Sequence, residues 1–326
     1  MDLNAHTRVW RGGKLEKENF PANQISDYLA ESDTIVWMDL CAPDADGLQV
    51  ISEEFGLDPL AVEDALSQHE RAKLDRYAGH LFLNVYTVEL DEETGQLATH
   101  EISAFITERA LVTVRGDEEF DTDALVKQWD SSPDLARYGV AYLLHGLLDL
   151  VVDGHFDAVQ SLDNAIEGLE ERLFADEVPT RDTQHRSYRL RKSLTLLRRV
   201  VLPMREVVNT LLRRDLNVVP EEMTPYFQDV YDHVLRATEW TESLRDVVTS
   251  LQETRIALQG NHLNQVMKKL TGWAAVIAVP TAVTGFYGQN VPYPGFGKEW
   301  GFLVSVFVLA GTALALYAIF KKRDWL

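Results

Sequence analysis

The sequence is poor in the features that mark most enzymes and nucleic-acid-binding proteins. Cys41 is the single cysteine in 326 residues, so an intrachain disulfide is impossible, and this composition fits a reducing cytoplasm. Lysine and arginine number 31 against 51 acidic residues, a formal net charge of −20, which argues against nucleic-acid binding and favours the attraction of cations. A Walker A phosphate loop is missing too, and Gly12 and Gly13 lack the context of a nucleotide site, so we expect no enzyme activity.

Charged residues are absent from two stretches near the C-terminus, 270–287 and 301–320. Each is close to the length of about 20 residues that a helix needs to cross a hydrocarbon core. We therefore predict two transmembrane helices, at 270–290 and 301–320, joined by an external loop at 291–300. A buried helix of a soluble protein is the alternative, but two such runs separated by one loop are hard to place in a soluble core.

The charges beside these stretches predict their orientation. Residues 268–269 are lysines and 321–323 are Lys-Lys-Arg, whereas Lys298 and Glu299 cancel in the loop. The positive-inside rule then puts both termini in the cytoplasm and the loop outside. The N-terminus lacks the apolar core of a signal peptide, which also favours a cytoplasmic body. We thus expect a multi-pass protein of the inner (plasma) membrane, with a cytoplasmic domain at 1–224, a stalk helix at 225–269 and a basic tail at 321–326.

The first part of the chain alternates between strand and helix patterns. Runs of β-branched and aromatic residues predict strands, and Asp58-Pro59 supplies an N-cap and a favoured first helical residue. In the strand expected at 80–90 both faces are largely apolar, so both faces of the sheet should be covered. The expected fold class is α+β, a sheet flanked by helices. The predicted strands are 34–40, 80–90, 102–107 and 111–115, with a turn at 91–95 and helices at 43–55 and from Pro59.

From Val140 onward the pattern is helical. It predicts a helical hairpin at about 140–214, with an acidic helix at 141–174, a break at Pro179 and a basic helix at 181–214. Two interpretations of this pair stay open. The helices have complementary charged faces, or they have two solvated faces whose ion pairs contribute little energy.

The proline-free stretch at 226–279 predicts one long helix of about 80 Å that runs into the membrane. Its apolar residues recur with coiled-coil-like spacing, so we expect partner chains to cover them and infer an oligomer. One chain with two spans cannot enclose a pore, whereas several copies around an axis can. Small and hydroxyl residues on the first span suit a pore lining, although ordinary packing of membrane helices uses them as well. The apolar residues are Val230, Val234, Leu244, Val248, Leu251 and Leu258.

Gly288-Gln289-Asn290, at the end of the first span, resembles the Gly-x-Asn signature of the CorA family of two-span divalent-cation transporters. The segment at 58–88 is similar to the family's cytoplasmic motif, and 225–251, 264–271 and the terminal KKRDWL match in the same order. The resemblance implies a homopentamer with a funnel-shaped cytoplasmic domain. It also implies a pore lined by the first spans that passes hydrated Mg²⁺, Co²⁺ or Ni²⁺. The zinc-transporting ZntB proteins form a related branch.

The resemblance also implies roles for particular residues of the pore. Five copies of Asn290 would present amide oxygens to hydrated Mg²⁺ at the outer mouth, and Gly288 would allow a positive φ or a close backbone approach. A simple helix C-cap is the alternative role of Asn290. Met267 and Leu270 match the family's hydrophobic constriction, for which plain helix packing is the alternative. The implied filter and pore residues are Gly288, Gln289, Asn290, Asn264, Met267, Leu270, Thr271, Ala278 and Thr281.

A regulatory metal site is implied in the cytoplasmic part. Glu63 and Asp64 would face the stalk acid Asp229 across a subunit interface, and Glu253 matches a further acidic position. Carboxylates that meet in this way repel unless a divalent ion bridges them, so a fall in cytoplasmic Mg²⁺ would loosen the interface and open the pore. Solvated helix acids are the alternative interpretation.

Two departures from the family pattern leave the transported ion open. Gln289 stands where the signature usually has methionine, and the loop lacks the family's Met-Pro-Glu segment. The nine histidines show no metal-ligand spacing such as His-x-x-x-His, so zinc is not favoured by them. Three functions therefore remain: a Mg²⁺ channel, a zinc transporter coupled to protons, and a membrane-anchored divalent-ion sensor that does not conduct.

Overall fold

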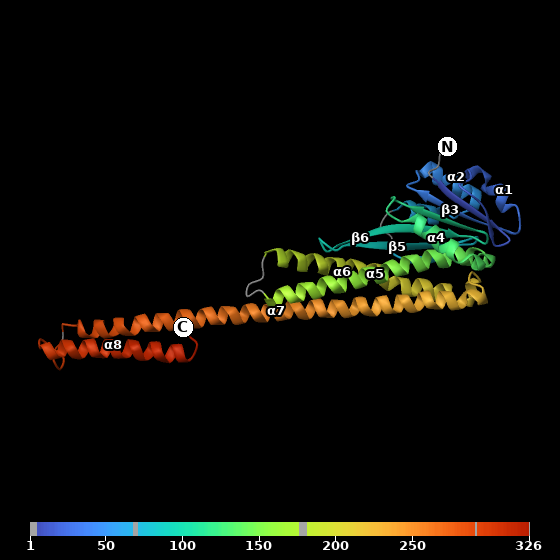
Figure 1. Ribbon diagram of the computed structural model, residues 1–326. Coiled ribbons are helices and arrows are strands. Elements are labelled where there is room, and N and C mark those ends of the chain that lie inside the picture. Colours follow the sequence, from blue (N-terminus) through green and yellow to red (C-terminus); the bar gives the residue numbers. More distant parts are fainter. Residues whose placement is uncertain (1–4, 68–70, 176–180, 291, 326) are drawn as a thin grey trace. The chain divides into compact units, whose positions relative to one another are not determined.

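The computed structural model describes residues 5–67, 71–175, 181–290 and 292–325 (Figure 1). The predicted helix break at Pro179 and the two predicted segment ends at Val291 and Leu326 lie outside the described residues. The elements in chain order are β1 (Ala5–Arg11), β2 (Lys14–Glu18), η1 (Ala22–Gln24), α1 (Ile25–Leu29), β3 (Thr34–Cys41), α2 (Ala45–Phe55), α3 (Pro59–Leu66), β4 (Lys73–Arg76), β5 (Leu81–Asp91), β6 (Gln96–Ile106), β7 (Ala110–Arg115), α4 (Thr122–Ser131), η2 (Pro133–Tyr138), α5 (Val140–Ala175), α6 (Arg181–Leu211), η3 (Arg214–Leu216), η4 (Glu221–Met223), α7 (Thr224–Tyr287) and α8 (Glu299–Lys322).

A seven-stranded mixed sheet in the order β2-β1-β3-β7-β6-β5-β4 forms the centre of the first part of the chain. Among the strands of the described residues, β3 and β7 pair in parallel and the other pairs are antiparallel. The four predicted strands are therefore confirmed as β3, β5, β6 and β7. The strands β1, β2 and β4 were not predicted, and they lie at the edge of the sheet or next to it. Gly12 and Gly13, both at positive φ, form the turn between β1 and β2.

The sheet has a hydrophobic core on each face, as predicted from the strand at 80–90. Leu81, Leu83 and Val85 belong to one core, whereas Phe82 belongs to the other. This split follows from the two-residue period of a strand, which turns successive side chains to opposite faces. Figure 1 shows α5 and α6 along the first face and the first part of α7 beyond them, with α1 and α2 on the other face. The α+β prediction, a sheet flanked by helices, is confirmed.

Side-chain caps set the beginnings of α2 and α3. The Asp58 carboxylate accepts a hydrogen bond from the Leu60 amide at 2.9 Å, and Pro59 occupies the first turn of α3, as predicted. The helix predicted to begin at Pro43 begins instead at Ala45, because the Asp44 side chain accepts from the Gly47 amide and caps it. The α3 side chains Ala61 and Val62 join the second core.

Helices α5 and α6 form the predicted hairpin, and apolar contacts hold it together. Buried leucines of α6, among them Leu190, Leu194 and Leu197, line its inner side. Arg198 of this basic helix pairs with Glu242 of α7 at 2.6 Å rather than with the acidic helix α5. This ion pair therefore does not support the interpretation that α5 and α6 have complementary charged faces. Burial of apolar side chains stabilises the hairpin more than an ion pair of this kind does.

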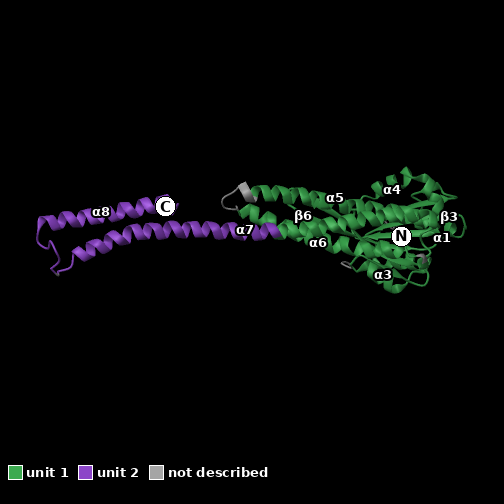
Figure 2. Cartoon of the chain, turned by 90° about the horizontal axis from the view of Figure 1, so that it is seen from below, with its two compact units in different colours: residues 1–249 green, residues 250–326 purple. Residues whose placement is uncertain are grey.

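The chain divides into two compact units, residues 1–249 and 250–326, and the boundary falls inside α7 (Figure 2). In the first unit, Phe227, Val230 and Val234 of α7 belong to the same core as α5. The inference that partner chains must cover the apolar stripe of α7 was therefore wrong for most of its length. Val230, Val234, Leu244, Val248 and Leu251 are buried by the protein's own helices, and Leu258 alone is exposed.

In the second unit, α8 folds back beside the C-terminal part of α7 (Figure 2). Both helices contain a stretch long and apolar enough to cross a membrane, and that stretch is 6% buried in α7 and 0% buried in α8. A core helix of a soluble protein would be mostly buried, so this exposure fits the predicted spans better than the soluble alternative.

Candidate ion pathway and metal-ion cluster

Five of the predicted pore residues lie on one helix and share one face of it. Asn264, Met267, Thr271, Ala278 and Thr281 belong to α7 and are separated by three, four, seven and three residues. Steps of three, four or seven residues keep side chains on the same face of an α-helix. All of them are exposed in the single chain, and Leu270, one position from Thr271, is 63% exposed. A polar-and-small stripe of this kind is available to line a pathway or to pack against another helix.

A cavity of about 460 Å³ borders the N-terminal end of this stripe. Asn264, Met267 and Thr271 line it, and Trp325 of the C-terminal tail lines it with them. Trp325 is held by stacking on Phe320 of α8, with ring centroids 5.5 Å apart. The structure thus brings three of the predicted pore residues together with the end of the chain, a relationship that spacing along α7 cannot reveal.

The signature Gly288-Gln289-Asn290 forms a turn directly after α7. The Gly288 amide donates to the Thr284 carbonyl at 2.8 Å, and the Gln289 amide donates to the Phe286 carbonyl at 3.3 Å. A Cβ atom on Gly288 would lie 3.1 Å from the Thr284 carbonyl oxygen, a tight contact that fits the expected close backbone approach and that a larger residue would relieve by a small shift. The alternative reason, a positive φ, is wrong: among the described residues, the positive-φ set contains neither Gly288 nor Asn290. Asn290 is exposed and is not the left-handed C-cap of α7.

The implied regulatory acids do not meet inside one chain. Glu63 and Asp64 lie on α3, whose side chains join the second core, whereas Asp229 lies on α7 beside Val230 of the first core. These cores occupy opposite faces of the sheet. Asp64 pairs with Lys73 at 2.6 Å, while Glu63, Asp229 and Glu253 are exposed. Lys73 already neutralises Asp64, so a divalent ion at Asp64 has to compete with this ammonium group.

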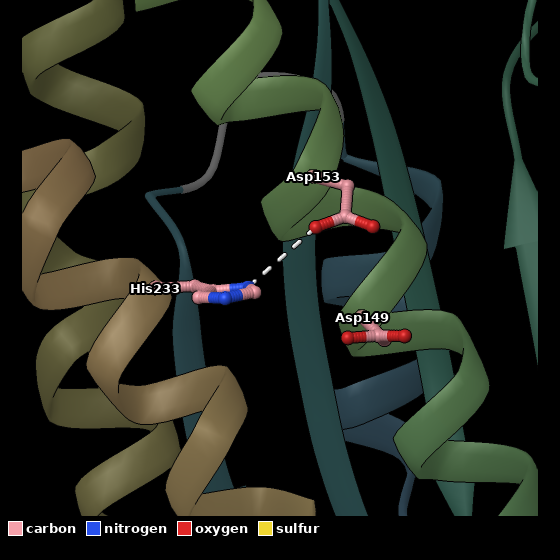
Figure 3. Close-up of side chains that lie close together, drawn as sticks. All are labelled: Asp149, Asp153 and His233. Atoms are coloured by element: carbon pink, nitrogen blue, oxygen red, sulfur yellow. Dashed lines mark ion pairs between the residues drawn. The ribbon is translucent and has the colours of Figure 1, made fainter.

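The structure assembles a different cluster of metal-ligating side chains, which was not predicted from the sequence. Asp149 and Asp153 of α5 and His233 of α7 point toward one another, and their ligand atoms lie within 4.8 Å of each other (Figure 3). His233 Nδ1 is 3.6 Å from a carboxylate oxygen of Asp153. Gln128 of α4 donates to the Asp149 carboxylate at 2.5 Å and so orients this carboxylate.

The electrostatics of this cluster include Asp229. Burial and the nearby Asp149 carboxylate raise the pKa of Asp153, and Asp229 adds to this effect while His233 opposes it. On the same side of α5, burial lowers the pKa of His145, although the carboxylates of Asp149 and Asp229 act against that shift. Asp229, the predicted regulatory acid, therefore lies within electrostatic range of the cluster.

Two carboxylates and one imidazole fit a divalent cation. Carboxylate oxygens suit Mg²⁺, and the imidazole adds affinity for Co²⁺, Ni²⁺ and Zn²⁺. The signal in the sequence was a pair of four-residue spacings, Asp149 to Asp153 on α5 and Asp229 to His233 on α7. Each spacing puts both side chains on one face of its helix, but only the packing of α5 against α7 brings the two faces together.

Comparison with known proteins identifies the family. The family described as "CorA-like Mg2+ transporter protein" matches residues 32–322, nearly the whole chain. This chain belongs to the CorA family. The family is one of transporters rather than enzymes, in agreement with the expectation of no enzyme activity.

Three relatives within the CorA family illustrate the similarity. The cobalt/magnesium transport protein CorA of Thermotoga maritima is 30% identical over 299 residues, which cover 91% of this chain and 85% of that protein. The zinc transport protein ZntB of Yersinia pseudotuberculosis is 23% identical over 272 residues, 82% of this chain and 81% of that protein. The complete structure of the CorA magnesium transporter from Methanocaldococcus jannaschii has a TM-score of 0.81 at 20% identity and covers 99% of this chain and 98% of that one. This structural similarity shows that the chain has the same fold as that transporter.

Proposed function

We propose that this chain forms a homopentamer in the plasma membrane and conducts divalent cations, Mg²⁺ foremost and Co²⁺ and Ni²⁺ as further substrates. The observation that carries the proposal is the position of Gly288-Gln289-Asn290, exposed at the end of an apolar helix in a member of a transporter family. Mg²⁺ sheds its water reluctantly, so a ring of neutral amide oxygens from Asn290 suits its hydrated form. The protein of Thermotoga maritima named as a cobalt/magnesium transporter supports the same choice of ions.

The α7 stripe would line the conduction pathway in this assembly. Asn264 supplies a polar ring on the cytoplasmic side, Met267 and Leu270 supply a hydrophobic constriction that gates by dewetting, and Thr271, Ala278 and Thr281 continue toward the signature. The exposure of all these side chains in a single chain supports their use between copies. The flanking lysines and arginine support a cytoplasmic location for both termini.

Regulation would use the acids of the cytoplasmic part. Because Asp64 and Asp229 lie over opposite faces of the sheet, a divalent ion can bridge them only between two subunits. The cluster Asp149–Asp153–His233 lies close to Asp229 and would hold a second ion within each subunit. At high internal Mg²⁺ both sites are filled and the interface is held closed; at low Mg²⁺ the repelling carboxylates loosen it. Glu63 and Glu253 would add to the negative potential around these ions.

Zinc transport is the second candidate. The similarity to the zinc transport protein ZntB and the imidazole of His233 beside two carboxylates favour it. Gln289 is compatible with either ion because an amide oxygen is a neutral ligand like that of Asn290.

Ion flux in proteoliposomes tests these functions. The full-length protein is reconstituted and given separate gradients of Mg²⁺, Co²⁺, Ni²⁺ and Zn²⁺, with a pH-sensitive dye inside. Mg²⁺ entry without proton movement is the expected result. Zn²⁺ entry with protons and no Mg²⁺ entry would assign the zinc function. No flux of any ion, with the oligomer intact by native mass spectrometry, would assign a non-conducting sensor.

A further inference from the structure

In residues 292–298, which precede α8, one aromatic side chain, Tyr293, makes most of the ring contacts. Its ring lies in edge-on contact with Tyr287, with centroids 5.1 Å apart, and with Phe296, at 5.4 Å. It also contacts Phe286 at 6.3 Å. Phe286 and Tyr287 are the last two residues of α7, so Tyr293 ties the loop to the helix turn that directly precedes the signature.

A hydrogen bond joins the same two elements. The Tyr293 hydroxyl donates to the Tyr287 carbonyl oxygen at 3.3 Å, a long contact that contributes less than the ring packing. Tyr287 is the last residue of α7, and its carbonyl is one of the groups that have no partner within the helix. The peptide unit that carries this oxygen continues directly into Gly288. Tyr293 therefore holds the backbone from which the Gly288-Gln289-Asn290 turn starts.

The backbone that follows Tyr293 is held by a close contact between Gly295 and Gly301. A Cβ atom on Gly301 would lie 2.2 Å from the carbonyl oxygen of Gly295, and Gly295 has a φ of +94°. The loop backbone therefore touches the first turn of α8. Amide hydrogen bonds from Phe296 to Tyr293 at 2.9 Å and from Lys298 to Gly295 at 3.1 Å complete the turns between them. These contacts fix the backbone that carries the Tyr293 ring.

We propose that Tyr293 is a positioning residue that sets the geometry of the Gly288-Gln289-Asn290 turn and thereby the ion selectivity of the outer mouth. The selectivity part rests on the conduction function proposed above. Gly288 and Gln289 are anchored on the α7 side by backbone bonds to Thr284 and Phe286. Tyr293 supplies the anchor on the other side, where this chain lacks a Met-Pro-Glu segment. Asn290 must hold its amide at a fixed distance to discriminate between hydrated ions, and a loose turn loses that discrimination.

Two substitutions separate the ring from the hydroxyl. Tyr293→Leu removes all three ring contacts, whereas Tyr293→Phe removes the long hydrogen bond only. Tyr317→Phe is the matched control, because Tyr317 lies on α8 and its ring contacts Lys321 rather than the loop. Hydrogen–deuterium exchange of the full-length protein in detergent reports the order of residues 284–290 without any need for transport. We expect about tenfold faster exchange in Tyr293→Leu, since each aromatic pair is worth about 2- to 12-fold in an equilibrium constant.

Flux ratios in proteoliposomes then test selectivity. Tyr293→Leu should lower the Mg²⁺ to Ni²⁺ flux ratio at least threefold, with a smaller change in Tyr293→Phe and none in Tyr317→Phe. A purely structural role of the loop would reduce all fluxes equally and leave the ratio constant, and that result would overturn the selectivity role. Unchanged exchange in Tyr293→Leu would overturn the positioning role. If the wild-type protein conducts no ion, the proposed conduction function is wrong. Hydrogen–deuterium exchange of the wild type and Tyr293→Leu then decides whether Tyr293 positions the turn.

Discussion

Asp153 on α5 and His233 on α7 face each other with 3.6 Å between a carboxylate oxygen and the ring Nδ1 atom. Asp149 completes the group one helical turn away, and Asp229 lies one turn before His233 on α7. The cluster joins a helix that packs on the sheet to the helix that carries the signature. Helix α7 therefore contributes His233 to the cluster and is also the helix that Gly288-Gln289-Asn290 follows in the chain.

Neutralising this cluster should release inhibition by internal Mg²⁺. In Asp153→Asn the carboxylate pair loses one charge, so an ion binds more weakly and flux should rise at least twofold at high internal Mg²⁺. Flux measured against internal Mg²⁺ concentration in proteoliposomes checks this. Glu167→Gln is the control, because Glu167 is an exposed acid on the same helix. Asp64→Ala and Asp229→Ala should act in the same direction, and unchanged inhibition in all three variants would remove the regulatory role.

Asn290→Ala should abolish flux and leave the oligomer intact. The substitution removes the amide that would contact hydrated Mg²⁺, and the exposed side chain makes little contribution to folding. Ion flux in proteoliposomes measures conduction, and native mass spectrometry of the same preparation measures the oligomeric state. Asn209→Ala, an exposed asparagine on α6, should conduct as the wild type does. Wild-type flux in Asn290→Ala would take Asn290 out of the filter.

Gly146→Ala should destabilise the protein although alanine is the better helix former. A Cβ atom at Gly146 would lie 2.3 Å from Nε1 of Trp129, a fully packed ring that donates to the Leu143 carbonyl. Overpacking of this kind costs about 1–3 kcal/mol of the free energy of unfolding. At Gly154, on the same helix, a Cβ atom meets nothing within 4 Å. Gly154→Ala should therefore stabilise by up to about 1 kcal/mol, and denaturant titration of the full chain in detergent compares the two. An unchanged free energy of unfolding in Gly146→Ala would show that Trp129 can move aside to accept the Cβ atom.

The stability of the protein should fall below pH 6.5 because of His155. This side chain is wholly buried, and burial lowers its pKa to about 4, while its Nε2 donates to the Tyr86 carbonyl at 2.7 Å. The unfolded chain takes up a proton near pH 6.5, but the folded protein does not do so until about pH 4. The stabilising contribution is therefore complete above pH 6.5 and is lost as the pH falls from there toward 4, at about 1.4 kcal/mol per pH unit.

Unfolding free energies of His155→Phe and the wild type between pH 7.5 and 5 check this contribution. The variant should lose stability less steeply over that range. The exposed His185 provides the control, since His185→Gln should keep the wild-type slope. Equal slopes in all three proteins would mean that His155 becomes protonated without unfolding.

Several features of this protein follow from its sequence alone. The uncharged runs identify α8 and the end of α7, since a bilayer requires about 20 apolar residues in a row whatever the rest of the fold. Asp58 and Pro59 mark the beginning of α3, because a cap acts on amides two or three residues away. The Gly288-Gln289-Asn290 segment identifies the family, which the whole-chain comparison confirms.

Other features depend on contacts between residues far apart in the chain, and only the tertiary structure decides them. The strands β1 and β2 carry the buried Arg8 and the charged run Lys14–Glu18, so their patterns do not indicate strands until the sheet pairs them. The apolar stripe of α7 was assigned to partner chains, because periodicity shows that a face must be covered but not by what. The metal-ion cluster joins α5 to α7, and the Tyr293 contact joins a loop to a helix end. Local spacing restricts the face of a helix on which a side chain lies, whereas packing decides which side chain it meets there.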